Sequence, residues 1–231
     1  MSLTDQQTAI LTNLGLTNAP VALAFVETPP IGLARIERAQ PAGCGYWREA
    51  SQGRAFYTTA DDHINCPVGA FTHGVALSDA QAQELRSLAG TMIELKYLKS
   101  EEVAQIPHRP DPMRFAAYAP LAGAAFDPDV VIFRGNPRQI MLLSEAARAA
   151  GVFAAGAVMG RPACAMVPQT LNAESAIASV GCIGNRVYTG LSDDELYITV
   201  PGGAVGNLLE QLETVLAANA ALEEFHRSRI G

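Results

Sequence analysis

The chain has 231 residues, of which 49% are hydrophobic and 17% charged, and its formal net charge is −7. This composition is typical of a globular protein with enough apolar material for a core, and it excludes a disordered chain. The acidic balance and the lack of a dense Lys/Arg run argue against nucleic-acid binding, because nucleic-acid binders gather basic side chains to neutralise phosphates.

The N-terminal sequence predicts no signal peptide, since it lacks a basic start followed by an apolar run. No stretch of about 18 uncharged apolar residues, the length that a membrane span needs, is present; the most apolar region, residues 146–160, is interrupted by Arg148. We therefore expect no membrane partner and a cytoplasmic location, where thiols normally stay reduced.

The first predicted elements alternate between helix and strand. Residues 4–14 carry a Thr-x-x-Gln capping box and an apolar stripe, which favour an opening helix. A short apolar run at 20–26 predicts a buried strand. Residues 46–53 fit a short helix that ends at Gly53, and the aromatic and β-branched segment 54–59 predicts a strand.

A proline and a capping box mark the next two helices. Pro67 suits the first turn of a short helix, which places Cys66 near the N-cap position. Residues 77–98 begin with a Ser-x-x-Gln capping box and predict a helix whose tail becomes a strand. The proline-rich segment 105–114 predicts a connecting loop.

The later part of the chain begins like the first. Residues 129–137 predict a buried strand followed by an Asn-Pro helix start, and the helix is expected to stop at Gly151. Strands are expected at 186–189 and 195–200. The apolar spacing of residues 207–225 predicts an amphipathic closing helix.

The order of features occurs twice: strand, proline, cysteine, cysteine, then Leu-Ser-Asp. We therefore predict a single domain over 1–231 made of two weakly similar halves, about 15–110 and 119–225. The predicted fold is α/β or α+β, with a mixed sheet and flanking helices. An internal duplication would pack the halves about a pseudo-two-fold axis and bring matching residues together near it.

Four cysteines, two in each half, are the main candidates for chemistry: Cys44, Cys66, Cys164 and Cys182. In one interpretation they are structural, because free cysteine packs like a small buried hydrophobe. In another they share a metal site, since four thiolates are the ligand set of a closed zinc site or an iron–sulfur cluster. No C-x-x-C pair is present, so this site would have to assemble four distant cysteines.

The third interpretation is thiol redox chemistry. Cys66 and Cys164 fit helix N-termini best, where backbone N–H groups and the helix dipole favour the thiolate. His63 lies three residues before Cys66 and is a candidate base or hydrogen-bond partner. A solvated loop histidine is the simpler alternative.

Further polar residues are candidates for ligand binding or for contacts around the cysteines: His63, Asn65, Arg161, Asn185 and Arg186. The two arginines flank the second cysteine pair and can bind a carboxylate or phosphate through paired hydrogen bonds. Polar turns and surface ion pairs explain the same residues without a ligand.

A family resemblance rests on six segments in order: VALAF…PP, CGYWREASQGRAFY, INCPVGA, PDVVIFRGNPRQIMLL, RPACAMVP and VGCIGNRVYTGLSDDELYITVPG. Together they resemble a widespread prokaryotic family known as domain of unknown function 169, over about residues 15–220. The resemblance implies a single full-length unit and makes the cysteine-bearing segments the family's pattern. It implies no reaction or substrate, and no catalytic residue carries over.

The leading hypothesis is a cytoplasmic metal- or iron–sulfur-binding protein with the four cysteines as ligands and either zinc or an iron–sulfur cluster as cofactor. The alternative is a non-catalytic small-ligand-binding or structural protein with buried cysteines. A thiol-redox enzyme using Cys66 or Cys164 comes third. A small molecule or a redox partner fits these hypotheses, and the apolar composition is compatible with a homo-oligomer.

Overall fold

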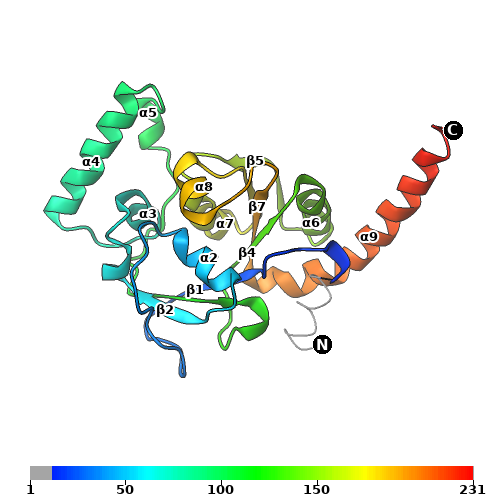
Figure 1. Cartoon of the computed structure of the whole chain (residues 1–231), viewed down its shortest axis with the longest axis horizontal. Helices are drawn as coiled ribbons and strands as arrows, with labels where there is room; N and C mark the ends of the chain where they lie inside the picture. The colour runs from blue at the N-terminus through cyan, green and yellow to red at the C-terminus, as the bar shows by residue number, and fades with distance from the viewer. Residues whose placement is uncertain (1–11, 231) are drawn as a thin grey trace.

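The computed structural model describes residues 12–230, without the side chains of 154–159. The predicted opening helix over 4–14 lies largely outside the described residues. Seven strands form one sheet in the order β2-β3-β1-β4-β7-β6-β5 (Figure 1). Only β5 and β6 run parallel, and every other neighbouring pair is antiparallel, so the predicted mixed sheet with flanking helices is confirmed as an α+β arrangement.

The strands are β1 (Val21–Val26), β2 (Phe56–Thr59), β3 (Phe115–Pro120), β4 (Val130–Gly135), β5 (Phe153–Met159), β6 (Ala176–Ser179) and β7 (Leu196–Pro201). The α-helices are α2 (Gly45–Ser51), α3 (Pro67–Thr72), α4 (Asp79–Glu94), α5 (Ser100–Val103), α6 (Pro137–Ala149), α7 (Met166–Ala173), α8 (Ile183–Thr189) and α9 (Val205–Arg227). Four 3-10 turns join them: η1 (Ala60–His63), η2 (Leu121–Gly123), η3 (Ala163–Ala165) and η4 (Gly202–Ala204).

The strand order from β2 to β6 is symmetric about the centre of the sheet. β1 and β4 pair antiparallel at the centre, with Ala22 opposite Val131. On either side, β3 and β7 pair with them in matching register, so that Val21 faces Pro120 and Val130 faces Pro201. The outer strand β2 pairs antiparallel with β3, and the outer strand β6 pairs antiparallel with β7. This is the arrangement that the predicted duplication would produce, and the duplication itself stays a prediction.

The symmetry extends to the turns that follow the matched strands. The N–H of Leu121 donates to the carbonyl of Pro20, and the N–H of Gly202 donates to the carbonyl of Asp129, both at 2.8 Å. β3 ends at Pro120 and belongs to the first half of the sheet. In the sheet, β3 thus holds the position in the first half that β7 holds in the second, and the predicted boundaries of the two halves stay a prediction.

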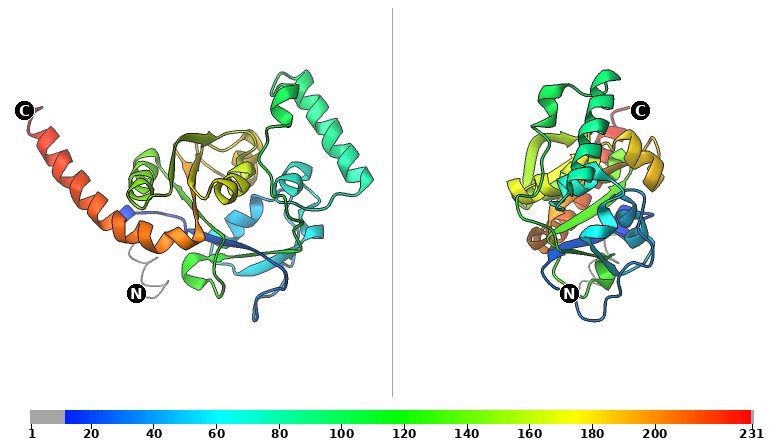
Figure 2. Two further views of the ribbon diagram at one scale, coloured as in Figure 1. Left: turned by 180° about the vertical axis from the view of Figure 1, so that it is seen from behind. Right: turned by 90° about the vertical axis from the view of Figure 1, so that its left-hand side faces the viewer.

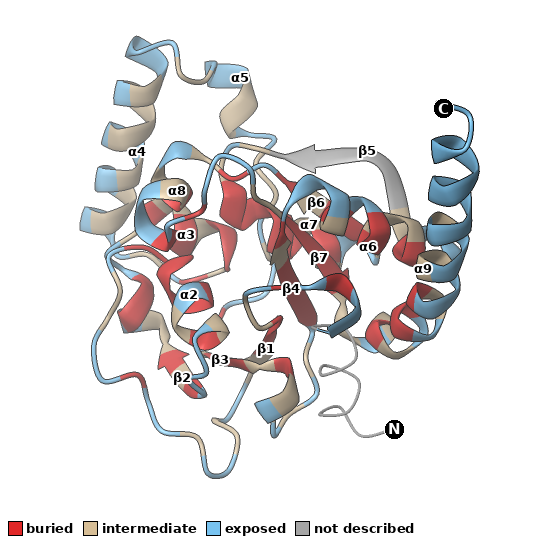
Figure 3. Cartoon of the chain, turned by 45° about the vertical axis from the view of Figure 1, so that its right-hand side comes forward, coloured by how far each residue is buried: buried red, intermediate tan, exposed pale blue. Residues whose placement is uncertain are grey.

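Each face of the sheet carries its own core, as the alternation of side chains along a strand requires. On one face, Leu23 and Ile132 pack with residues of α2, α3 and α7. On the other face, Ala22 and Val131 pack with residues of α6 and the first half of α9. Figure 3 shows these buried residues on the strands and on the inner sides of the helices.

Capping residues in the sequence correctly predicted where several helices begin. Cys66 is the N-cap of α3 with Pro67 in its first turn, and Asn136 caps α6 through a capping box with Gln139. The capping box at Ser78 opens α4 as predicted.

Other predictions were wrong. Residues 186–189 lie in helix α8, because Cys182 caps its start and Gly190 ends it in the left-handed conformation at φ 65°. The tail of the segment 77–98 leads through a turn into α5 and forms no strand. Strand β3 was missed because its alanine-rich sequence has weak β-propensity.

Two helical segments project from the body at opposite ends (Figures 1 and 2). Helix α4 has no buried residue, and the buried residues of α9 all lie in its first half, ending at Leu212. Within residues 12–230, no helix combines the length and the apolar character that crossing a bilayer requires.

The close approach at Gly202 gives a stability prediction. A Cβ at this position would overlap the carbonyl oxygen of Pro128, which is backbone and has little room to move. We expect Gly202→Ala to lower the free energy of unfolding by about 3 kcal/mol, measured by urea denaturation.

The neighbouring Gly203→Ala is the matched control, because a Cβ there meets nothing within 4 Å. We expect it to leave stability unchanged or to raise it by up to about 1 kcal/mol. Equal losses in the two variants would contradict the close approach at Gly202.

Candidate functional site

All four cysteines lie at or beside helix starts on one face of the sheet. Cys44, Cys66 and Cys182 are the N-caps of α2, α3 and α8, and Cys164 lies in the η3 turn that leads into α7. These four helices gather on the same side of the molecule (Figures 1 and 3). Two of the cysteine-bearing segments come from each half of the sheet.

The halves exchange contacts across the centre. Helix α2 of the first half packs against α8 of the second, and α3 of the first half packs against η3 of the second. Negative charge on Cys66 or Cys182 contributes to the raised pKa of Cys44, and negative charge on any of the other three cysteines contributes to that of Cys164. The four predicted cysteines therefore lie in one region on the same face of the sheet, and all four are free thiols. Among the described residues no three potential ligands converge closely enough to hold a metal ion, so the shared metal site stays a prediction.

Backbone N–H groups point at the two partly exposed sulfurs. The N–H of Gly69 donates to Cys66 Sγ, and the N–H of Asn185 donates to Cys182 Sγ, each at 3.4 Å. The space is tight, since a Cβ on Gly69 would lie 3.2 Å from Cys66 Sγ and 3.7 Å from the backbone nitrogen of Gly43. Gly69 thus lets the first turn of α3 lie against the loop that carries Cys44.

The other two thiols are buried and protonated at neutral pH. Burial raises the pKa of Cys44 to about 12, although the side chain of Asn185 lowers it in part. Burial also raises the pKa of Cys164 well above its ordinary value, and the hydroxyl of Thr72 opposes the rise. A buried neutral thiol is a poor nucleophile, so these environments do not favour Cys164 as an attacking group.

Asn185 is the polar residue most closely tied to the cysteines. Its side chain is buried, and neither amide atom has a hydrogen-bond partner at normal distance among the described residues. It lies close enough to Cys44 and Tyr197 to lower the pKa of each against the rise that burial causes. Cys182 positions it, because Asn185 is the third residue of the helix that Cys182 caps.

Two buried histidines lie beside the cysteine cluster. His63 Nε2 is 2.9 Å from the hydroxyl of Thr58, while His63 Nδ1 and both ring nitrogens of His73 have no partner among the described residues. A Cβ on Gly43 would lie 3.5 Å from His63 Nδ1, which places the ring next to the loop of Cys44. Burial lowers the pKa of His63 to about 4 and that of His73 to about 3, so both are neutral at pH 7.

The remaining predicted residues are engaged in holding loops. Asn65 donates to the carbonyl of Gln40 at 3.3 Å. Arg161 donates to the carbonyl of Tyr97, and its guanidinium lies 5.2 Å from the centre of that ring. Arg186 donates to the carbonyls of Val180 and Ser192 at 2.7 and 2.8 Å. Their predicted role in ligand binding stays a prediction.

The sequence did not point to three residues of the site: Thr72, His73 and Tyr197. Thr72 and His73 follow Cys66 at the end of a six-residue helix, and no local pattern marks them. Tyr197 comes from β7, which reaches the site only because the two halves share one sheet.

A family model described as "Uncharacterised ArCR", DUF169, matches residues 9–211. The chain belongs to the DUF169 family. The chain is also similar to uncharacterized protein MJ0308 of Methanocaldococcus jannaschii, with 27% identity over 168 residues, which is 69% of this chain and 70% of that protein. No solved structure matches it. The predicted resemblance to this family is confirmed. It assigns the chain to a family but indicates no activity.

The different environments of the thiols in this DUF169 protein predict an order of alkylation. Cys44 and Cys164 are 7% and 8% exposed, whereas Cys66 and Cys182 are partly open to solvent. In the folded, metal-free protein we expect iodoacetamide to label Cys66 and Cys182 first, as measured by peptide mass spectrometry. In urea all four should react alike, and fastest labelling of Cys164 in the folded protein would contradict the burial.

The turn before Cys66 depends on a buried carboxylate. Asp62 accepts two hydrogen bonds from Arg35, at 2.9 and 3.0 Å, and two from the backbone and hydroxyl of Thr59. Burial alone would raise the pKa of Asp62, but these bonds lower it below its ordinary value. The charged form therefore stabilises the fold at neutral pH, and this contribution is lost as pH falls from about 4 through the lower folded pKa.

We expect Asp62→Asn to lower the urea midpoint at pH 7, because the variant keeps the shape but loses the charge. The difference from the wild type should shrink as pH falls below about 4. Asp61→Asn is the control, since Asp61 is exposed on the same turn. A pH-independent difference for Asp62→Asn would show that the charge does not stabilise this turn.

Proposed function

We propose that this DUF169 protein binds an iron–sulfur cluster through Cys44, Cys66, Cys164 and Cys182. The observation that carries the proposal is that four thiols at or beside helix starts, two from each half of the sheet, gather on one face, where α2 packs against α8 and α3 against η3. Four thiolates are the usual protein ligands of two-iron and four-iron clusters.

The proposal takes a four-iron cluster rather than a single zinc ion. Among the described residues, no three His, Cys, Asp or Glu side chains converge closely enough to hold one metal ion. In a tetrahedral zinc site with Zn–S bonds of about 2.3 Å, the sulfurs lie only about 3.8 Å apart. In a four-iron cluster each cysteine binds a different iron, so the four sulfurs do not have to converge on one ion.

The surroundings of the thiols also suit a redox cluster. Amide N–H groups of Gly69 and Asn185 point at ligand sulfurs, and hydrogen bonds to sulfur stabilise the added negative charge of a reduced cluster. Cys44 and Cys164 would anchor the cluster in the core, while the sides of Cys66 and Cys182 remain open to solvent. When bound, the cluster would supply one-electron transfer with a redox partner.

The proposal includes a cytoplasmic location, where the four thiols stay reduced until a cluster is delivered. The main alternative is a structural or ligand-binding protein in which the cysteines only pack. The thiol-redox enzyme is disfavoured for Cys164, whose burial keeps the thiol protonated. These alternatives differ in metal content, which makes them separable.

The test is to purify the full chain without oxygen, or to reconstitute it with iron and sulfide, and to measure iron, sulfide and visible absorption. We expect a brown protein whose iron and acid-labile sulfide are present in comparable amounts. Each single Cys→Ser variant should lose most of the bound iron, because a cluster needs all of its protein ligands. Circular dichroism checks that each variant still folds.

Asn65→Ala is the matched control, because Asn65 is next to Cys66 but, among the described residues, its side chain bonds the carbonyl of Gln40 and no other group. It should keep its iron. A colourless protein that contains one equivalent of zinc would contradict the cluster and indicate a zinc site instead. Iron-free protein together with four well-folded serine variants would overturn the proposal in favour of structural cysteines.

A further inference from the structure

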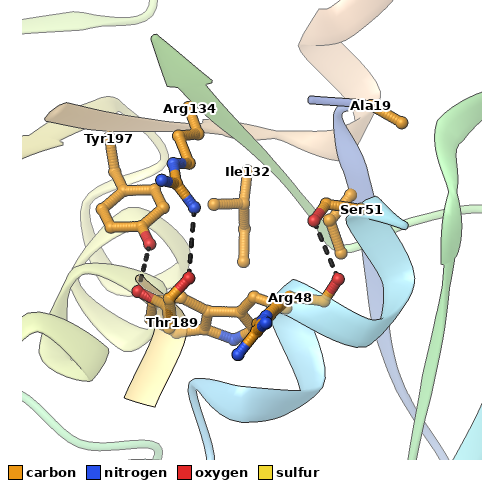
Figure 4. Close-up of a pocket in the computed structure, with 9 residues that line it drawn as sticks. Ala19, Arg48, Ser51, Ile132, Arg134, Thr189 and Tyr197 are labelled. Carbon is orange, nitrogen blue, oxygen red and sulfur yellow. Dashed lines mark hydrogen bonds between the residues drawn. The ribbon is translucent and has the colours of Figure 1, made fainter. Parts of the chain in front are cut away.

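A small pocket opens at the centre of the sheet, between the two halves (Figure 4). Its floor includes Val21 and Ile132, which face each other in the central pairing of β1 with β4. One wall comes from α2 and carries Trp47 and Arg48, and the ring of Tyr197 lines the pocket in edge contact with Trp47, with ring centres 5.8 Å apart. The pocket is therefore built from both halves, like the cysteine cluster.

Most polar groups of the pocket are already engaged with the protein. Arg134 donates to Glu195 and to the carbonyls of Thr189 and Gly190. The hydroxyls of Tyr197 and Ser51 donate to Thr189 Oγ1 and to the carbonyl of Arg48 (Figure 4). Glu195 balances the charge of Arg134, so neither group is left to bind a ligand.

Two donors remain free, and both come from α2. The indole N–H of Trp47 is buried and has no acceptor among the described residues. Trp47 is 2% exposed, so its N–H can reach only a group inside the protein or the pocket. The guanidinium of the next residue, Arg48, has no ion-pair or hydrogen-bond partner in the described part of the chain and lines the same pocket.

An unpaired buried N–H costs free energy until an acceptor fills the space. The cavity has a volume of about 20 Å³, which is enough for one water-sized group but not for a larger molecule. The free groups, an indole N–H and a guanidinium, are donors only and carry one positive charge. An anionic oxygen matches the donor character and the charge of these two groups and is small enough for the cavity, which would leave the rest of its molecule at the pocket mouth.

We propose that this pocket binds a small oxyanion, an inorganic oxyanion or the carboxylate of a small organic acid. One oxygen accepts from Trp47 Nε1, and the Arg48 guanidinium neutralises the charge. This binding site goes beyond the proposed cluster and does not depend on it. The two sites are near each other, because Cys44 and Trp47 lie one turn apart on α2 and Tyr197 of the pocket wall also contacts Asn185.

Trp47 is the only tryptophan of the chain, so its fluorescence reports directly on the pocket. The experiment titrates the full-length protein with sodium formate, acetate, sulfate or phosphate at constant ionic strength, with chloride as the reference salt. We expect a saturable change in Trp47 emission with at least one of these anions. The comparison of carboxylates with inorganic oxyanions identifies which source the pocket prefers.

Arg48→Gln should weaken the binding by about tenfold or more, because a charge-assisted contact is lost. Arg54→Gln is the matched control, since it removes the same charge just beyond the same helix, where Arg54 pairs with Glu49. Trp47→Phe, followed by calorimetry, should weaken binding as well. This test reads fluorescence of metal-free protein, so its outcome is independent of cluster binding.

Two outcomes overturn the proposal. One is the absence of a saturable response to all four anions, which would mean that water alone occupies the pocket. The other is an equal effect of Arg48→Gln and Arg54→Gln, which would mean that the anions respond only to overall charge.

Discussion

The antiparallel pairing of β1 with β4 is the constraint on which the rest of the structure depends. Three residue pairs centred on Ala22 and Val131 join the two halves into one sheet. Because the pairing is symmetric, it places matching strands at equal distances on both sides. The same geometry brings the helix starts of both halves together above one face. The cysteine cluster and the small pocket both take residues from the two halves, so both depend on this central pairing.

Symmetry in the backbone is combined with asymmetry in the side chains. In the first half, His63, His73 and Tyr118 form a buried polar group beside Cys44. In the second half, Thr199 occupies the register position that matches Tyr118 and pairs with Thr170 at 2.6 Å. The two sides of the cysteine cluster therefore present different chemistry to anything bound between them, although the strands that support them match.

The sequence predicted what local interactions determine. Helix caps at Cys66 and Asn136 follow from side-chain chemistry within three residues, and the structure has both. From the sequence, the cysteines could be expected to lie near one another only if the predicted internal duplication was assumed. Sites such as Tyr197 or the free N–H of Trp47 depend on contacts between distant segments, which no local spacing encodes. The helix at 186–189 shows the same limit, because its ends outweigh its β-branched residues.

The position of the thiols on both sides of the central pairing has a mechanical consequence. A cofactor held by Cys44 and Cys66 on one side and by Cys164 and Cys182 on the other would act as a cross-link between the halves. Cross-links that close long loops restrict the unfolded chain most, and a ligand that binds only the folded state stabilises it by mass action. Occupancy of the site would then add to the stability of the contact between the two halves.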